Sequence, residues 1–183
     1  NAGSYSTSAV AQHTFALILE HFSKVGEYSA FVEDGGWTTR GPSALAFGDG
    51  YAAPNELATH ELPMIVEQFA AAAVRAREAG FQTVEIHAAH GYLLHQFLAD
   101  STNQRTDRYG GSPENRARLA AEIIEAVADE IGPGRVGVRI SPANAAGDVH
   151  EVDTISAYEA LLQRISPLGL AYLHALINPD SAD

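Results

Sequence analysis

The stretch EIHAAHGYLLHQF, residues 85–97, gathers side chains that could do two kinds of chemistry. The imidazoles of His87 and His90 can donate hydrogen bonds to an oxygen that gains negative charge, and the phenol of Tyr92 can donate a proton. Together with His95, the two histidines could instead bind a metal ion. No cysteine or carboxylate accompanies them at the customary ligand spacing. We therefore expect no metal site and favour a surface that binds a substrate, with His95 packed in the core.

The position of these residues relative to a predicted strand supports this interpretation. TVEIH, residues 83–87, has the composition of a strand, so that His87 closes it and His90 and Tyr92 follow its carboxyl end. Parallel α/β barrels place their active-site groups at this end of the strands.

Two of the predicted strands carry a polar face as well as an aliphatic one. Glu85 and His87 share one face of the first strand. Arg139 and Ser141 share one face of VGVRIS, residues 136–141. A doubly wound sheet would be aliphatic on both faces, so this asymmetry favours a barrel. Because a buried charge must be paired, we expect Glu85 and Arg139 to meet inside it.

From residue 59 onward, helices and strands alternate, which is typical of parallel strands joined by crossover helices. The fold class is therefore expected to be α/β: a partial TIM-type (β/α) barrel of about three parallel strands with crossover helices, plus an extra N-terminal helix. Apolar spacing and terminal signals predict helices over 4–25, 60–79, 113–131 and 153–165, strands over 83–87, 136–141 and 170–177, and a loop over 33–55.

The segment NQRTDRYGGSPENRARL, residues 103–119, is predicted to be architectural. Ser112 is placed to cap a helix that Pro113 opens, after a turn at Tyr109-Gly110-Gly111. We expect Arg105, Arg116 and Arg118 to anchor this loop, and we expect His174, like His95, to be packed.

Composition narrows the possible partners and compartment. A formal net charge of −12 argues against nucleic acid and anionic membranes as partners. No apolar run approaches the ~20 residues that span a bilayer. The chain has no cysteine, which suits the reducing cytoplasm.

The order HAAHGY, then NQRTDRYGGSPENRARL, then VGVRISP resembles the old yellow enzyme family of FMN-dependent NAD(P)H ene reductases, over residues of about 41–177. The resemblance implies reduction of activated C=C bonds in enones or nitro compounds, with FMN as cofactor and NADPH or NADH as reductant. By the same resemblance, His87 and His90 bind the substrate's oxygen and Tyr92 delivers a proton to its α-carbon. Arg139 is then the residue that lies against the electron-rich edge of the flavin.

Residues 5–37 differ from that family and resemble a helical segment of D-2-hydroxyacid dehydrogenases. We therefore expect a division into residues 1–40, of separate origin, and residues 41–183, a partial flavin-oxidoreductase barrel. A complete barrel needs roughly 250 residues, and only three of its strands are recognisable. One alternative is a non-catalytic truncated or fused fragment that cannot hold FMN. An NAD-dependent 2-hydroxyacid dehydrogenase is another, although no dinucleotide-binding glycine motif is present. Exposed sheet edges make a homo-oligomer conceivable in either case.

Overall fold

A computed structural model of the chain describes residues 40–45, 53–145 and 149–176. The chain divides into two units, Asn1–Thr38 and Thr39–Asp183, and every described residue belongs to the second. The helix predicted over residues 4–25 lies outside the described residues, as does nearly all of the segment 1–40.

A parallel sheet of three strands forms the centre of the described part. Its strands are β3 (Val84–Ala88), β4 (Val136–Ile140) and β5 (Tyr172–Ala175), in the order β3-β4-β5. The prediction of parallel strands with crossover helices is confirmed. The sheet is open, because β3 and β5 each have only one strand partner within the described residues, and the predicted barrel is therefore present only in part.

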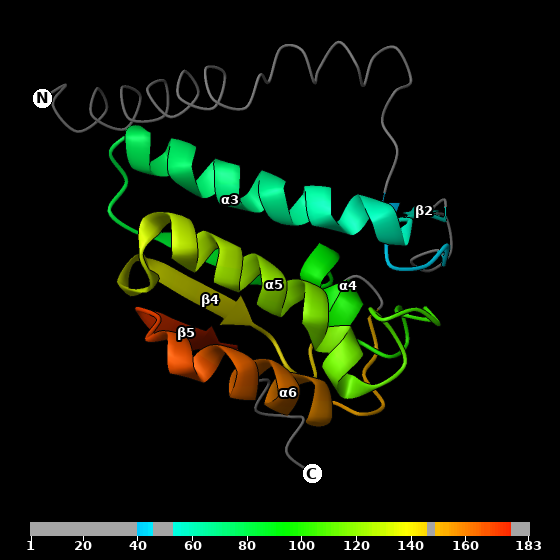
Figure 1. Cartoon of the computed structure of the whole chain (residues 1–183). Helices are drawn as coiled ribbons and strands as arrows, with labels where there is room; N and C mark the ends of the chain where they lie inside the picture. The colour runs from blue at the N-terminus through cyan, green and yellow to red at the C-terminus, as the bar shows by residue number, and fades with distance from the viewer. Residues whose placement is uncertain (1–39, 46–52, 146–148, 177–183) are drawn as a thin grey trace, which may run out of the picture. The chain divides into compact units, whose positions relative to one another are not determined.

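Helices α3 (Leu62–Glu78), α5 (Pro113–Ile131) and α6 (Ser156–Ile165) lie side by side over one face of the sheet, with α5 in the middle (Figure 1). An apolar stripe on α5 makes this packing favourable, because its residues recur at helical spacing and are removed from water. The aliphatic sides of β3 and β4 complete the same core. Its central members are Leu119, Ile123, Ile124 and Val127 of α5 together with Ile86, Val138 and Ile140 of the strands.

The boundaries of α5 follow the signals in its sequence. Ser112 accepts a hydrogen bond from the Asn115 amide at 3.3 Å, and Pro113 is the first helical residue. Gly132 ends the helix with a φ of 87°, a backbone conformation that favours glycine. The predicted cap and terminator are confirmed.

The loop before α5 is anchored by the arginines that the sequence singled out. Arg105, which is 6% exposed, donates to the carbonyl oxygens of Pro42 at 3.0 Å and Leu57 at 2.5 Å. Arg116 donates to the Leu98 carbonyl at 3.0 Å, and Arg118 donates to that of Arg108 at 2.7 Å. Two very short strands, β1 (Arg40–Gly41) and β2 (Asn55–Glu56), pair beside this loop.

Three sequence predictions are corrected. Helix α4 (Leu93–Leu98) was not predicted, because its residues are buried on almost every side and show no amphipathic period. Glu85 does not meet Arg139, because the strand register sets Glu85 opposite Gly137 and His87 opposite Arg139. Glu85 instead lies 3.1 Å from His174. His174 is therefore not packed as predicted, but lies on β5, whose residues are all exposed.

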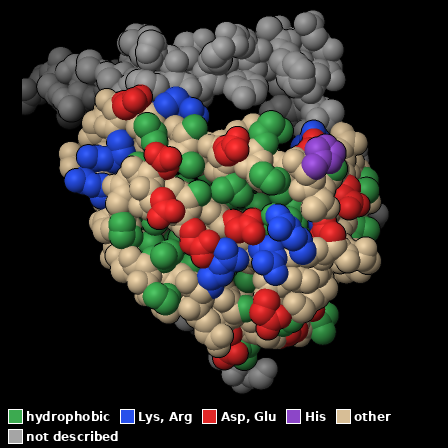
Figure 2. Space-filling model, viewed as in Figure 1, with side chains coloured by type: hydrophobic (Ala, Val, Ile, Leu, Met, Phe, Trp, Pro, Cys, Tyr) green, Lys and Arg blue, Asp and Glu red, His purple; other side chains and the backbone are tan. Residues whose placement is uncertain are grey.

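The outer face of the helices carries acidic and basic side chains in mixture, with hydrophobic patches between them (Figure 2). One of the pairs links neighbouring helices, since Arg164 of α6 and Glu125 of α5 approach to 2.6 Å. Among the described helices, none combines the length and apolar character needed to cross a bilayer.

Candidate active site

The predicted site residues lie together at the carboxyl end of the sheet. His87 is the fourth residue of β3, His90 and Tyr92 lie in the turn between β3 and α4, and Arg139 lies on the neighbouring strand β4. Because adjacent parallel strands end at the same edge, the sequence folds these side chains toward a common space.

The three rings converge. The ring centroids of His87 and His90 are 5.3 Å apart, and those of His87 and Tyr92 are 5.2 Å apart. The ring planes are tilted by 41° and 58° respectively, so that neither pair stacks face to face. Tyr92 is 64% exposed, which leaves its hydroxyl accessible to a ligand. Two hydrogen-bonding imidazoles and one phenol can therefore act on the same small molecule.

The turn that carries His90 and Tyr92 has an unusual backbone. His90 has a φ of 56° and Gly91 a φ of 76°, both in the left-handed region. The Ser141 hydroxyl, just after β4, accepts a hydrogen bond from the His90 amide at 2.8 Å. Ser141 was predicted only to share a polar strand face, because no sequence pattern indicates which backbone amide its hydroxyl would meet. Its role here is to connect the ends of β3 and β4.

Both imidazoles of the predicted pair are held in the neutral form at pH 7. Burial lowers the pKa of His87 most, followed by the nearby His90 and Arg139. The pKa of His90 is also lowered, first by burial and then by Arg139. Each neutral ring retains one N–H donor, which is what an acceptor oxygen requires.

Arg139 supplies positive charge beside these rings. Its Nε atom is buried and has no hydrogen-bond partner among the residues that the structure describes. A buried donor without a partner is unfavourable, and an acceptor atom on a bound group would satisfy it. The arginine therefore fits the flavin edge that the sequence resemblance assigns to it.

His95 is packed beneath the turn that carries His90 and Tyr92. Its ring is fully buried, and its Nδ1 atom accepts a hydrogen bond from the Gly91 amide at 2.8 Å. The expectation that His95 is packed is confirmed. Within the described ranges, no group of three or more metal-binding side chains is arranged around a common point.

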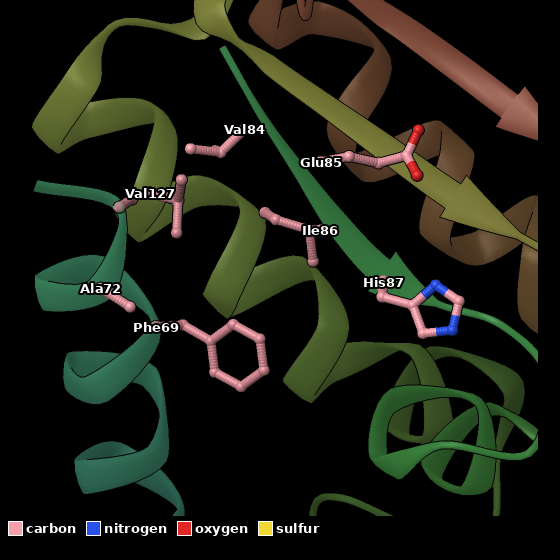
Figure 3. Close-up of a pocket in the computed structure, with 8 residues that line it drawn as sticks. Phe69, Ala72, Val84, Glu85, Ile86, His87 and Val127 are labelled. Atoms are coloured by element: carbon pink, nitrogen blue, oxygen red, sulfur yellow. The ribbon is translucent and has the colours of Figure 1, made fainter. Parts of the chain in front are cut away.

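A separate hollow of about 260 Å³ lies beside β3. Phe69 and Ala72 of α3, Val84 and Ile86 of β3, and Val127 of α5 face it (Figure 3). Glu85 and His87 point to the other side of the strand, as the alternation of side chains requires (Figure 3). Both residues nevertheless belong to its lining, so the hollow is an apolar gap between the helices and the edge of the sheet that borders His87.

Comparison with known proteins assigns the chain to a family. The model of the NADH:flavin oxidoreductase / NADH oxidase family matches residues 16–182. The chain belongs to this family. The resemblance to old yellow enzymes is thereby confirmed, and the family's cofactor is FMN. The match begins at residue 16, so the separate origin of residues 1–40 stays a prediction. The alternative of a hydroxyacid dehydrogenase has no support from this family assignment.

Among curated relatives, 12-oxophytodienoate reductase 1 of Oryza sativa subsp. japonica is 47% identical over 133 residues, or 72% of this chain and 35% of the relative. Putative 12-oxophytodienoate reductase-like protein 1 of Arabidopsis thaliana is 59% identical over 92 residues, or 50% of this chain and 28% of the relative. The chain spans about a third of the length of these relatives.

Solved structures of the family share the fold of the described part. Morphinone reductase in complex with tetrahydroNAD matches with a TM-score of 0.73 and 40% identity, over 77% of this chain and 43% of that one. The old yellow enzyme homologue from Zymomonas mobilis matches with a TM-score of 0.74 and 34% identity, over 78% and 42%. These neighbours are TIM barrels, of which this chain forms an open part.

Proposed function

We propose that this chain carries the substrate-binding and proton-donating part of an FMN-dependent NAD(P)H ene reductase, which reduces activated C=C bonds of enones and of nitro compounds. The observation that supports the proposal is the convergence of His87, His90 and Tyr92, with ring centroids 5.2–5.3 Å from that of His87. The relatives named 12-oxophytodienoate reductase and morphinone reductase fit a small-molecule substrate with a conjugated carbonyl.

His87 and His90 bind the carbonyl or nitro oxygen of the substrate. Negative charge develops on this oxygen as the C=C bond is reduced, so two donors fixed in place stabilise the transition state more than the ground state. A preorganised donor of this kind contributes on the order of 3 kcal/mol. The lowered pKa values favour neutral rings at pH 7, each of which keeps one N–H donor for this oxygen.

Tyr92 donates its phenolic proton to the α-carbon of the substrate. The two histidines, in contrast, only donate hydrogen bonds to its oxygen. General acid catalysis of this kind contributes roughly 10²–10⁴ in rate. FMN, when bound, supplies the hydride for the β-carbon after reduction by NADPH or NADH. Arg139 would hold the electron-rich edge of the flavin through its unpaired Nε donor.

A second candidate function is that of a non-catalytic fragment that cannot hold FMN. The observation in its favour is the open sheet, with an apolar hollow beside β3 and exposed residues along β5. Such edges favour pairing with another chain, so self-association accompanies either candidate. For both candidates we propose a cytoplasmic location, because a chain without cysteine suits a reducing compartment.

FMN titration separates the two candidates. We expect the fluorescence of free FMN to be quenched as the purified chain is added, and the visible bands of the flavin to shift. Arg139→Met should weaken binding on the order of tenfold, because a charge-assisted hydrogen bond is lost. Arg118→Met removes an arginine of α5 that bonds the Arg108 carbonyl, and it is the matched control. A chain that leaves FMN fluorescence unchanged at all concentrations would support the fragment.

A further inference from the structure

A buried hydrogen-bond network lies directly behind the turn that carries His90 and Tyr92. Its central residue is His95, which is 0% exposed. The Gly91 amide donates to His95 Nδ1 at 2.8 Å, and His95 Nε2 lies 3.3 Å from Glu151 Oε1. The side chain of Glu151 is only 3% exposed. The proposed function uses none of these contacts.

The contacts of His95 fix its protonation state. Because Nδ1 accepts a hydrogen bond from Gly91, it carries no proton, and the ring proton must lie on Nε2. The Nε2–H group then donates to the Glu151 carboxylate. The pair is therefore a neutral imidazole bonded to a carboxylate, and not an ion pair, since a doubly protonated ring would have no acceptor to offer Gly91.

Glu151 connects this network to the second turn of the site. Its Oε2 atom accepts from the Ala143 amide at 2.7 Å, in the turn after β4, where Ala143 has a φ of 58°. Its Oε1 atom also accepts from the Tyr158 hydroxyl at 2.7 Å. Among the described residues, the three groups bonded to this carboxylate are all donors, so three hydrogen bonds hold Glu151 in one position.

Among the described residues, each backbone amide of the His90–Tyr92 turn has one acceptor. Ser141 accepts from His90, His95 accepts from Gly91, and the Ala89 carbonyl accepts from Tyr92 at 3.2 Å. A buried amide needs an acceptor, and at Gly91 that acceptor is a side chain of α4. The imidazole nitrogen of His95 supplies this acceptor and thereby stabilises the left-handed backbone of the turn.

We propose that His95 is a positioning residue, which holds the His90–Gly91 turn through Nδ1 while Glu151 fixes its Nε2–H tautomer, so that the His90 imidazole and the Tyr92 phenol face one ligand. The effect on catalysis rests on the function proposed above. The effect on the turn does not, and the two can be measured separately.

Two substitutions at residue 95 separate positioning from packing. In His95→Asn the amide oxygen occupies about the place of Nδ1 and can still accept from Gly91. In His95→Gln the amide reaches toward Glu151 and leaves the Gly91 amide without an acceptor. We expect hydrogen exchange of the Gly91 amide, followed by NMR, to remain slow in the Asn variant and to become about tenfold faster in the Gln variant. His60→Gln, on the exposed surface, is the matched control.

A second measurement, the pKa of His90, reports on the site itself. NMR titration should show the pKa of His90 close to that of the parent chain in His95→Asn, and raised toward its ordinary value in His95→Gln, because the released turn lets the ring move into water. Equal effects of the two substitutions, or no effect of either, would overturn the proposal. Should Gly91 and His90 respond as expected while enone turnover is absent from all chains, the proposed function fails and the positioning of the turn stands.

The parent chain offers a test that does not depend on any variant folding. The ¹⁵N chemical shifts of the His95 ring distinguish a protonated Nε2 from a protonated Nδ1. We expect the Nε2–H tautomer at neutral pH. A protonated Nδ1 would overturn the proposal, because that nitrogen could not accept a hydrogen bond from Gly91.

Discussion

At the scale of single residues, the site depends on two imidazoles that remain neutral. Burial is the main cause of the lowered pKa of each, and Arg139 adds to it in both. An unfolded chain would titrate these histidines near the ordinary value of about 6.5. The folded chain therefore resists protonation that the unfolded chain accepts, and stability is lost as the pH falls from about 6.5 through the lowered pKa values.

An NMR titration of His87 and His90 tests this directly. We expect both to titrate below pH 6.5, and we expect Arg139→Met to raise both pKa values because it removes a nearby positive charge. His60→Gln serves as the control for assignment. Histidines that titrate at or above the ordinary value would mean that the rings lie apart in water.

The sequence predicted which side chains meet in this site but not how their backbone is held. His87, His90 and Tyr92 could be placed because they end a strand of a parallel sheet, where position along the strand determines location. The hydrogen bonds of Ser141 and His95 to the turn could not be predicted, because they depend on left-handed torsion angles at His90 and Gly91. A positive φ is uncommon for histidine, and nothing in the sequence around His90 indicates one.

At the scale of elements, the loop between α4 and α5 is held by one buried arginine. Arg105 pairs with Asp107 at 2.5 Å and bonds two carbonyl oxygens of the segment before α3. This pairing, with further hydrogen bonds from Thr59 and the Tyr109 amide, holds the pKa of Asp107 well below its usual range. A side chain at Gly110 would collide with the Arg105 carbonyl, at 2.4 Å from the added carbon, which explains the glycine there.

Arg105→Met should lower the free energy of unfolding by about 3 kcal/mol, because it keeps the aliphatic stem but leaves buried acceptors unpaired. Arg118→Met, whose hydrogen bond is exposed, should lower it by less than about 1 kcal/mol. Urea unfolding at pH 7 measures both. The loss should shrink as the pH falls below about 4, where an unpaired Asp107 becomes protonated. Equal losses for the two variants would contradict this account of the loop.

The elements that the sequence predicted well have complete local signals. The apolar stripe, cap and terminal glycine of α5 all indicate the same helix, and the structure has it at Pro113–Ile131. Helix α4 lacked such signals because tertiary contacts bury it nearly all round. The predicted pairing of Glu85 with Arg139 was wrong, because residues on the same face of two strands need not lie opposite each other. The register between the strands decides which residues are opposite, and it sets Glu85 beside Gly137.

At the scale of the whole molecule, both edges of the sheet are available for pairing within the described part. Val84 and Ile86 border the apolar hollow beside β3, and Tyr172 and Leu173 of β5 are 44% and 46% exposed. Unpaired edges of this kind promote association between chains.

We therefore expect the apparent molecular mass of the protein in sedimentation equilibrium to rise with its concentration. Leu173→Lys should reduce this association, because a charge on an edge strand opposes pairing. Val152→Lys adds the same charge at a residue that is 91% exposed and lies off the sheet, and should leave the association unchanged. A chain that remains monomeric at every concentration would contradict the expectation.

The central claim is that His87, His90 and Tyr92 act on one bound substrate, with Tyr92 as the proton donor. Its most direct test is the comparison of two half-reactions in the FMN-loaded Tyr92→Phe variant, by stopped-flow absorbance. Reduction of bound FMN by NADPH or NADH should stay within about twofold of the parent chain, whereas reoxidation by 2-cyclohexenone should slow by roughly 10²-fold or more. Equal loss in both half-reactions, or no loss in the second, would contradict the account.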